Sequence, residues 1–113
     1  TPGKNFPCSG ACGPWMVTAD EIPDPSVLEL TTRLNGAVVQ QSPISDMRFS
    51  VPDIIAYCST FTTLQPGDII TTGTPGGVGA GRSPQVWLRE GDRVSVEING
   101  IGVLKNEVAD EPI

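Results

Sequence analysis

The sequence predicts a mostly β fold of the α+β class with one main helix, on three observations. Asn35-Gly36 and Asn99-Gly100 each lie between segments in which apolar and polar residues alternate, which is typical of β-hairpins. The 113 residues include 13 glycines and 11 prolines, a composition that favours turns and short strands. Residues 51–60 carry the capping residues and the apolar spacing of a helix. We expect a single segment, residues 1–113, within one domain.

The first part of the chain is expected to consist of loops and short strands. Residues 1–14 are rich in Gly, Pro, Ser and Cys and predict a loop, whereas the apolar residues 15–18 predict a short strand. Two prolines in residues 19–25 exclude a helix there. Residues 28–34 alternate between apolar and polar side chains, and residues 37–39 return after the Asn-Gly turn, so these two segments predict a hairpin.

A helix is predicted over residues 51–60. Ser50 can cap its N-terminus, Pro52 fits its first turn, and Asp53 resembles the distal residue of a capping box. Four residues fall on one face at helical spacing and are expected to be buried: Val51, Ile54, Ile55 and Cys58. Pro66-Gly67 ends the helical region.

The second part of the chain repeats the pattern of turn and strand. A short apolar strand is expected at residues 68–72, followed by a loop with four glycines at residues 73–79. Residues 94–98 and 101–108 flank the second Asn-Gly turn and predict the second hairpin.

Composition and charge narrow the class of function. The net charge of −6 and the pI near 4.3 argue against a nucleic acid or a membrane surface as partner. No apolar run is long enough to cross a membrane and no signal peptide opens the chain, so we expect a cytoplasmic location. With three cysteines (Cys8, Cys12 and Cys58) and no histidine, a closed zinc site would be hard to complete, and we assign no metal ligand. The opening residues are typical of an internal loop, so we expect a piece of a longer protein.

The glycine-rich loop is the candidate binding site. Glycine permits positive φ and lets a ligand approach the backbone N–H groups, and Thr74 adds a hydroxyl among those donors. These groups suit an anion, most simply a carboxylate or an enolate oxygen. The alternative is an ordinary mobile surface loop. The loop lacks the Lys-Ser/Thr pair of a phosphate loop, and residues 80–84 do not start the helix that a dinucleotide site requires.

Several blocks together resemble the C-terminal half of a fumarylacetoacetate hydrolase family enzyme. They are residues 3–6, 13–15, 18–25, 45–50, 64–79 and 97–102, and the resemblance covers essentially the whole chain. It implies a mixed β-roll or sandwich of the C-terminal domain type, a homodimer, and a Mg²⁺ or Mn²⁺ at the active site. It also implies hydrolysis of a C–C bond in a β-diketo or 2-oxo acid through a metal-chelated enolate, often in aromatic catabolism.

The resemblance implies roles for particular residues. Lys4 matches the family's active-site lysine, and Thr74, with Gly73 and Pro75 beside it, matches the substrate-binding threonine. Cys8 stands where the family often has threonine or alanine. The family's metal-binding Glu-x-Glu, a later Asp and the lid with its base precede this segment, so we expect the isolated 113 residues to be inactive.

Alternatives remain open at this point. Within the enzyme class, the reaction could be that of a hydratase, decarboxylase or isomerase of 2-oxo-dioic acids. Outside it, the chain could be a truncated, non-catalytic β domain. A further possibility places a hard cation at Asp20, Glu21 and Asp24, against the simpler reading that these carboxylates stabilise a turn.

Overall fold

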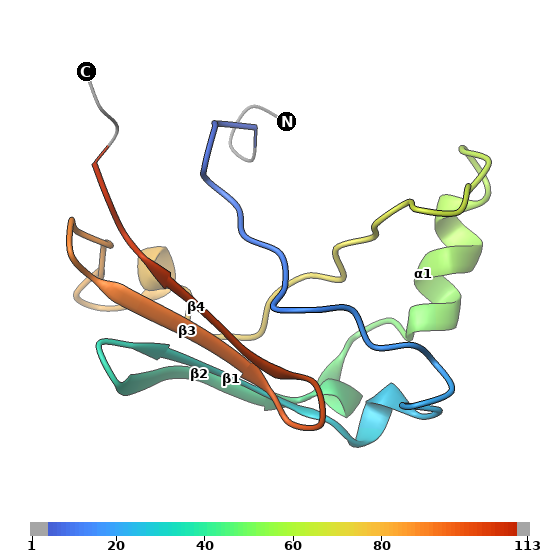
Figure 1. The fold of residues 1–113 in the computed structure, drawn as a ribbon, viewed down its shortest axis with the longest axis horizontal. Coiled ribbons are helices and arrows are strands. Elements are labelled where there is room, and N and C mark those ends of the chain that lie inside the picture. The colour runs from blue at the N-terminus through green and yellow to red at the C-terminus, as the bar shows by residue number, and fades with distance from the viewer. Residues whose placement is uncertain (1–4, 111–113) are drawn as a thin grey trace.

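The structure, a computed structural model, describes residues 5–110 and is built on one four-stranded antiparallel sheet. Its strands are β1 (Glu29–Leu34), β2 (Ala37–Pro43), β3 (Arg93–Ile98) and β4 (Gly102–Glu107). They lie side by side in the order β2-β1-β3-β4, so β2 and β4 are the edge strands (Figure 1). With its one α-helix, this sheet confirms the predicted mostly β class.

Both hairpins turn at the predicted Asn-Gly pairs. Asn35 and Gly36 take positive φ angles of 51° and 86°, which Asn and Gly adopt more readily than other residues. Asn35 also ties this turn to the start of β3, because its Nδ2 donates to Asp92 Oδ1 at 2.8 Å and its Oδ1 accepts from the Arg93 N–H at 2.8 Å. The hydrogen bond from Asn35 lowers the pKa of the Asp92 carboxyl. The two hairpins are thus joined by side chains as well as by the β1–β3 ladder.

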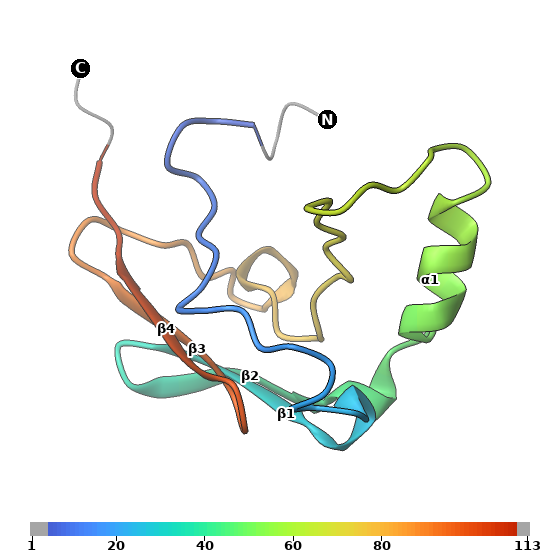
Figure 2. The ribbon, with the colours of Figure 1, turned by 45° about the vertical axis from the view of Figure 1, so that its right-hand side comes forward.

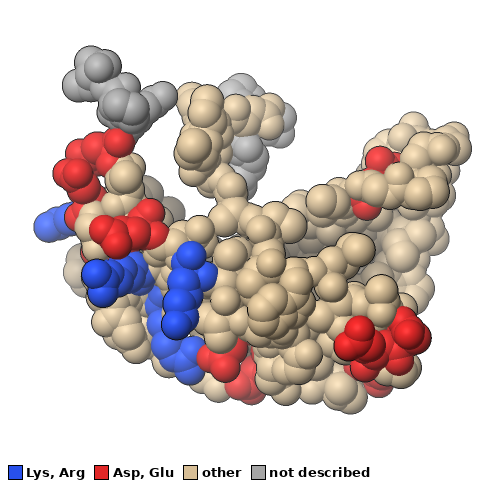
Figure 3. Space-filling model, viewed as in Figure 1, with Lys and Arg blue, Asp and Glu red and all other residues tan. Residues whose placement is uncertain are grey.

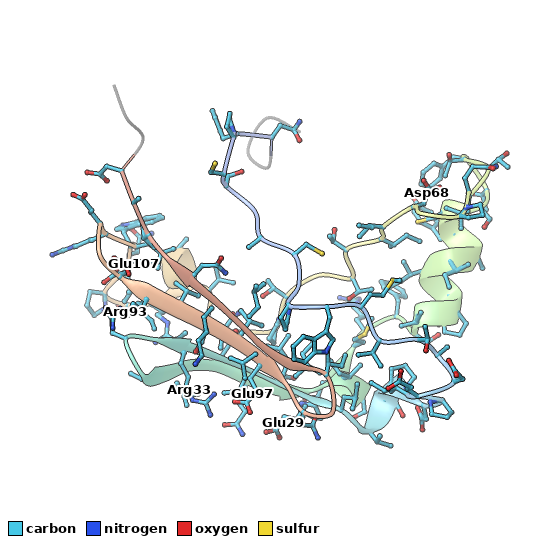
Figure 4. The ribbon with its side chains drawn as sticks, in the orientation of Figure 1. Glu29, Arg33, Asp68, Arg93, Glu97 and Glu107 are labelled. Atoms are coloured by element: carbon cyan, nitrogen blue, oxygen red, sulfur yellow. The ribbon has the colours of Figure 1, made fainter. Side chains whose placement is uncertain are left out.

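The two faces of the sheet differ in polarity. One face carries an ion pair of 2.7 Å between Arg33 and Glu97 and a hydrogen bond from Gln41 to Glu29, and Figure 4 shows Arg33, Glu97 and Glu29 projecting from the same side. Alternation along the strands places the apolar residues on the opposite face: Leu30, Leu34, Val94, Val96, Ile98 and Leu104. The N-terminal segment crosses that face, since a Cβ on Gly102 would meet the ring of Trp15.

The helix α1 (Val51–Cys58) begins where the sequence predicts. Ser50 Oγ accepts from the Asp53 N–H, and Asp53 Oδ2 accepts from the Ser50 N–H at 3.1 Å, so the capping box is present. Pro52 lies in the first turn, where its missing N–H has no intrahelical partner to lose. The helix ends two residues before the predicted end, because residues 59–62 form a turn.

The prediction that one face of α1 is buried is wrong. Ile55 is 44% exposed, and Val51, Ile54 and Cys58 are only half-buried. The cause is the position of the helix, which stands beside the sheet rather than on it (Figures 1 and 2). Among the described residues only Leu28, Thr31 and Thr32 are buried, each with 8% of its surface exposed, so the core is small.

The two isolated strands predicted at residues 15–18 and 68–72 are also wrong. Both segments are irregular in the structure. A strand needs a neighbour to accept its backbone hydrogen bonds, and neither segment joins the β2 or β4 edge. Three short 3-10 helices complete the elements: η2 (Pro25–Val27), η3 (Ile44–Asp46) and η4 (Gly79–Gly81). No helix within residues 5–110 has the length and apolar character needed to cross a membrane.

Candidate functional site

A cleft of about 510 Å³ lies beside the glycine-rich loop. Its walls are Leu30 of β1, the end of β2, residues between β2 and α1, Ile54 of α1, and loop residues 72–76. The chain between α1 and η4 returns from the far end of the helix toward the sheet and brings the loop to this position (Figure 2). The cleft is thus formed where the sheet, the helix start and the loop meet.

The three predicted substrate-binding residues, Gly73, Thr74 and Pro75, all line this cleft. Gly73 has a φ of +105°, and a Cβ there would meet no atom within 4 Å, so the backbone conformation rather than crowding favours glycine. Within residues 5–110, the N–H groups of Gly73, Thr74, Gly76 and Gly77 donate to no backbone carbonyl. Thr74 is exposed. Among the described residues, the loop therefore offers backbone donors that no carbonyl engages, and a hydroxyl, which together can bind an anionic oxygen.

The side chains of Gln40, on β2, and Arg82, which follows the loop in the sequence, hold the loop against the edge of β2. Gln40 Nε2 donates to Thr74 Oγ1 at 3.0 Å and to the Pro75 carbonyl at 2.9 Å. Arg82 Nε donates to the Gly77 carbonyl at 2.9 Å, and Arg82 Nη2 donates to the Val39 carbonyl. Three of these side-chain hydrogen bonds are made to the loop itself, two by Gln40 and one by Arg82. The fourth joins Arg82, which follows the loop in the sequence, to β2.

A β-bulge in β2 lies at the point where the loop is bound to this strand. The register steps from Thr32–Gln40 to Arg33–Val38, so Val39 has no partner on β1. Gly77 lies so close to the Val39 carbonyl that a Cβ would overlap it. Sequence analysis missed Gln40, Arg82 and the bulge, although two valines followed by two glutamines at residues 38–41 break the alternation of a regular strand.

The charges at the cleft are few. Asp46 and Arg48 are the charged residues in its wall, and the Arg48 guanidinium lies 6.0 Å from the centroid of the Phe49 ring. The two ion pairs within residues 5–110 lie on the sheet, away from the cleft. On the face drawn in Figure 3, the Lys and Arg side chains gather over the sheet, whereas Asp and Glu are the charged residues on the helix side.

The remaining sequence predictions lie elsewhere. Lys4, the predicted catalytic residue, lies outside the described residues. Cys8 is exposed, has a φ of +57° and does not line the cleft. The turn around it is closed by Ser9, whose Oγ donates to the Phe6 carbonyl at 2.7 Å. The structure therefore places Cys8 in a turn, outside the set of residues that line the cleft.

The side chains of Asp20 and Asp24 stabilise turns, and Glu21 takes part through its backbone. The Glu21 N–H donates to the Thr18 carbonyl at 3.1 Å, and the Thr18 side chain lowers the pKa of Asp20. Asp24 Oδ1 accepts from the Ser26 N–H at 2.9 Å and caps η2, and the hydrogen bond with Ser26 lowers the pKa of Asp24. In the part of the chain that the structure describes, no three Cys, Asp or Glu side chains group as a metal site would require. These residues do not fit a divalent cation by themselves.

Comparison with known proteins places this geometry in a family. The sequence profile described as fumarylacetoacetate (FAA) hydrolase C-terminal matches residues 1–109. A rat (Rattus norvegicus) relative named mitochondrial oxaloacetate tautomerase is 48% identical over 106 residues, which are 94% of this chain and 34% of the relative. The chain thus spans about a third of the length of that curated relative.

Two solved structures share the fold. A fumarylacetoacetate hydrolase from psychrophilic Exiguobacterium antarcticum is 42% identical, with a TM-score of 0.84 over 88% of this chain and 35% of that one. A maleylpyruvate hydrolase from Sphingobium sp. SYK-6, in complex with manganese(II) and pyruvate, is 38% identical, with a TM-score of 0.77 over 86% of this chain and 34% of that one. The chain belongs to the fumarylacetoacetate hydrolase family and corresponds to the C-terminal portion of its catalytic domain.

Proposed function

We propose that the whole protein hydrolyses a C–C bond in a β-diketo or 2-oxo acid, with a substrate similar to fumarylacetoacetate or an acylpyruvate. The observation that carries this proposal is the cleft at the glycine-rich loop. There a hydroxyl lies on one wall together with N–H groups that donate to no carbonyl of residues 5–110. The similar maleylpyruvate hydrolase, whose structure contains pyruvate, supports a 2-oxo acid as the ligand of this cleft. Residues 1–113 would then supply one part of a larger catalytic domain.

The described residues suit the charge that develops in such a reaction. In the hydrolysis, a hydroxyl from water adds to the distal carbonyl carbon, and the bond from that carbon to the neighbouring CH₂ breaks. The electron pair passes to the 2-oxo acid as an enolate, which is then protonated at carbon. The Thr74 hydroxyl and the N–H groups around it would hold the carboxylate or the enolate oxygen, and their positions are fixed before the substrate arrives.

Two further parts of the site belong to the proposal. Lys4 would place its ammonium near a substrate oxygen or the attacking water, as its match to the family's lysine implies. A Mg²⁺ or Mn²⁺ would act as a Lewis acid toward the substrate oxygens, as the manganese in the similar hydrolase suggests. Its ligands would come from outside residues 5–110, since the described carboxylates do not converge.

A second candidate function is an isomerisation of the same class of acid. The rat relative named as a tautomerase favours it, because interconversion of enol and keto forms also passes through an enolate. Hydration or decarboxylation of a 2-oxo-dioic acid would use the same cleft. A truncated, non-catalytic β domain would keep binding and lose turnover.

The test is an assay of the natural chain at its full length with an acylpyruvate and with oxaloacetate, each with Mn²⁺ or Mg²⁺. We expect pyruvate release from the acylpyruvate that EDTA abolishes, and a loss of about a hundredfold or more in Lys4→Met, which removes charge at similar volume. The matched control Lys105→Met, on β4, should keep wild-type turnover. Enol–keto conversion without C–C cleavage would favour the second candidate, and activity that persists in EDTA would contradict both.

Assembly and location complete the proposal. We propose a homodimer, supported by the large apolar side chains that the described residues leave exposed, among them Phe6, Trp15, Phe61 and Trp87. A cytoplasmic location also stays a proposal, because the rat relative is named as mitochondrial. Light scattering and cell fractionation of the full-length protein test these two points.

A further inference from the structure

We propose that Gln40 is a positioning residue that directs the hydroxyl proton of Thr74 toward the substrate. The inference rests on the proposed function, because it concerns how the loop presents its donor to an anionic oxygen. Gln40 is not among the residues that line the cleft, and it acts through Thr74, which is.

The hydrogen bonds of Gln40 fix the orientation of its amide. The Pro75 carbonyl can only accept, so the amide group that faces it at 2.9 Å must be the NH₂. The same nitrogen lies 3.0 Å from Thr74 Oγ1, and its second hydrogen is available for that bond. Gln40 therefore donates to both residues and cannot accept from the Thr74 hydroxyl in this arrangement.

The consequence falls on the Thr74 hydroxyl. A hydroxyl has one hydrogen to donate and two lone pairs to accept with. Since one lone pair of Thr74 Oγ1 is engaged by Gln40, the hydroxyl hydrogen turns away from Gln40 and toward another acceptor. Thr74 lines the cleft, so a carboxylate or enolate oxygen bound there would receive a charge-assisted hydrogen bond.

The base of Gln40 is firmly held. Its register partner on β1 is Thr32, which is 8% exposed and lies in the small core of the sheet. The bulge at Val39 and the bond from Arg82 fix the chain immediately before Gln40, and Arg82 also holds Gly77 at the far end of the loop. Gln40 is thus held in place by the sheet, and it in turn holds the Thr74 hydroxyl in place.

The test compares Gln40→Glu with Gln40→Met in the natural chain at its full length, by calorimetric titration of oxalate with Mn²⁺ present. The Glu substitution replaces the NH₂ with a carboxylate oxygen that accepts the hydroxyl hydrogen of Thr74. The hydroxyl then donates to this carboxylate and no longer toward the ligand. We expect oxalate affinity to fall by about ten- to a hundredfold, the size of one hydrogen bond to a charged group. The Met substitution leaves the hydroxyl free to rotate, so its loss should be only a few-fold.

A double-substitution cycle separates this role from plain charge repulsion and from loop support. In a Thr74→Val background no hydroxyl remains to reverse, so Gln40→Glu should cost at most about threefold there. The control Gln41→Met removes the neighbouring amide, which donates to Glu29 Oε1 at 2.8 Å on the other face, and should leave oxalate affinity unchanged.

The outcomes are distinct. An equal loss from Gln40→Glu with and without the Thr74 hydroxyl overturns the inference and leaves the proposed function standing. Equal losses from the Glu and Met substitutions do the same, because they indicate a merely structural role. Absence of oxalate binding by the unsubstituted protein overturns the proposed function, and this inference with it.

Discussion

Thr74 is the residue on which the account of the site depends most. Its Oγ1 accepts from Gln40 while its side chain stays exposed in the wall of the cleft. Thr74→Val keeps the shape of the side chain and removes the hydroxyl, so it should weaken oxalate or pyruvate binding by about 1–3 kcal/mol in the full-length protein. Calorimetry measures the change. Thr60→Val, which removes a hydroxyl bonded to the Tyr57 carbonyl, is the matched control. Unchanged affinity in Thr74→Val with an intact fold contradicts the role.

The sequence predicted that Gly73, Thr74 and Pro75 bind substrate, and the structure places all three in the wall of the cleft. The sequence did not indicate the side chains that hold them. Several glycines close to a threonine can be seen within one segment of the sequence, and the ability of that segment to bind a ligand follows from glycine's conformational freedom. Gln40 is 34 residues before Thr74, so their contact depends on how the chain returns from α1. No pattern within a single segment of the sequence predicts how the chain returns from α1 to β2.

The contact between the loop and β2 can be tested by substitution of two neighbouring glycines in the loop. Gly77 has a φ of +101° and faces the Val39 carbonyl closely, whereas a Cβ on Gly76 would meet nothing within 4 Å. Gly77→Ala should therefore destabilise the full-length protein by more than about 1 kcal/mol, and Gly76→Ala by about 0.5 kcal/mol or less. Urea denaturation of both variants measures the difference, and equal stability would show that the loop is not packed on β2.

The start of α1 should respond to acid. The hydrogen bond with Ser50 lowers the pKa of Asp53 below its usual 3.8, and the carboxylate is the form that accepts from the Ser50 N–H. A depressed folded-state pKa contributes stability that is present above the unfolded pKa and is lost as the pH falls through the folded one. We expect helical circular dichroism of the full-length protein to weaken below pH 3.8.

In Asp53→Asn the part of that acid transition due to the cap should disappear. The amide still accepts through its oxygen but does not titrate, so the helical signal should depend less on pH. Asp68→Asn, at an exposed turn where Asp68 Oδ2 accepts from the Gln65 N–H, is the control and should keep the transition. Identical acid transitions in the Asp53→Asn variant and the wild type would remove the cap from the account.

Elements with their own local signals were predicted correctly, and elements that needed a partner were not. The Asn-Gly turns and the Ser50–Asp53 capping box are contained in a few residues, so the sequence shows them. Residues 15–18 and 68–72 each contain neighbouring apolar residues, but neither segment pairs with a strand edge of the sheet. The burial of α1 depends on what packs against it, which the helix sequence does not state.

The whole molecule exposes more surface than its mass predicts. Its accessible surface is 9079 Å², against roughly 6,000 Å² for a folded monomer of this mass. The excess coincides with exposed aromatic and aliphatic side chains on the helix and the loops, such as Tyr57, Phe61 and Trp87. Exposed apolar surface of this extent is typical of a contact surface, and the curated rat relative is about three times as long as this chain.

This exposure predicts how residues 1–113 behave when they are expressed alone. We expect them to bind a hydrophobic dye strongly and to unfold with low cooperativity, because so little of the chain is buried. The natural chain at its full length is the control and should bind little dye. A sharp thermal transition without dye binding in the 113 residues would show that the sheet and helix pack more tightly than described.

The central claim is that the cleft beside residues 72–76 holds the anionic end of a 2-oxo acid. The most direct measurement is a crystal structure of the full-length protein with Mn²⁺ and oxalate. We expect an oxalate oxygen within about 3.2 Å of Thr74 Oγ1 or of a neighbouring loop N–H, with Gln40 still donating to Thr74. Oxalate bound elsewhere, with these loop donors facing only water, would contradict it.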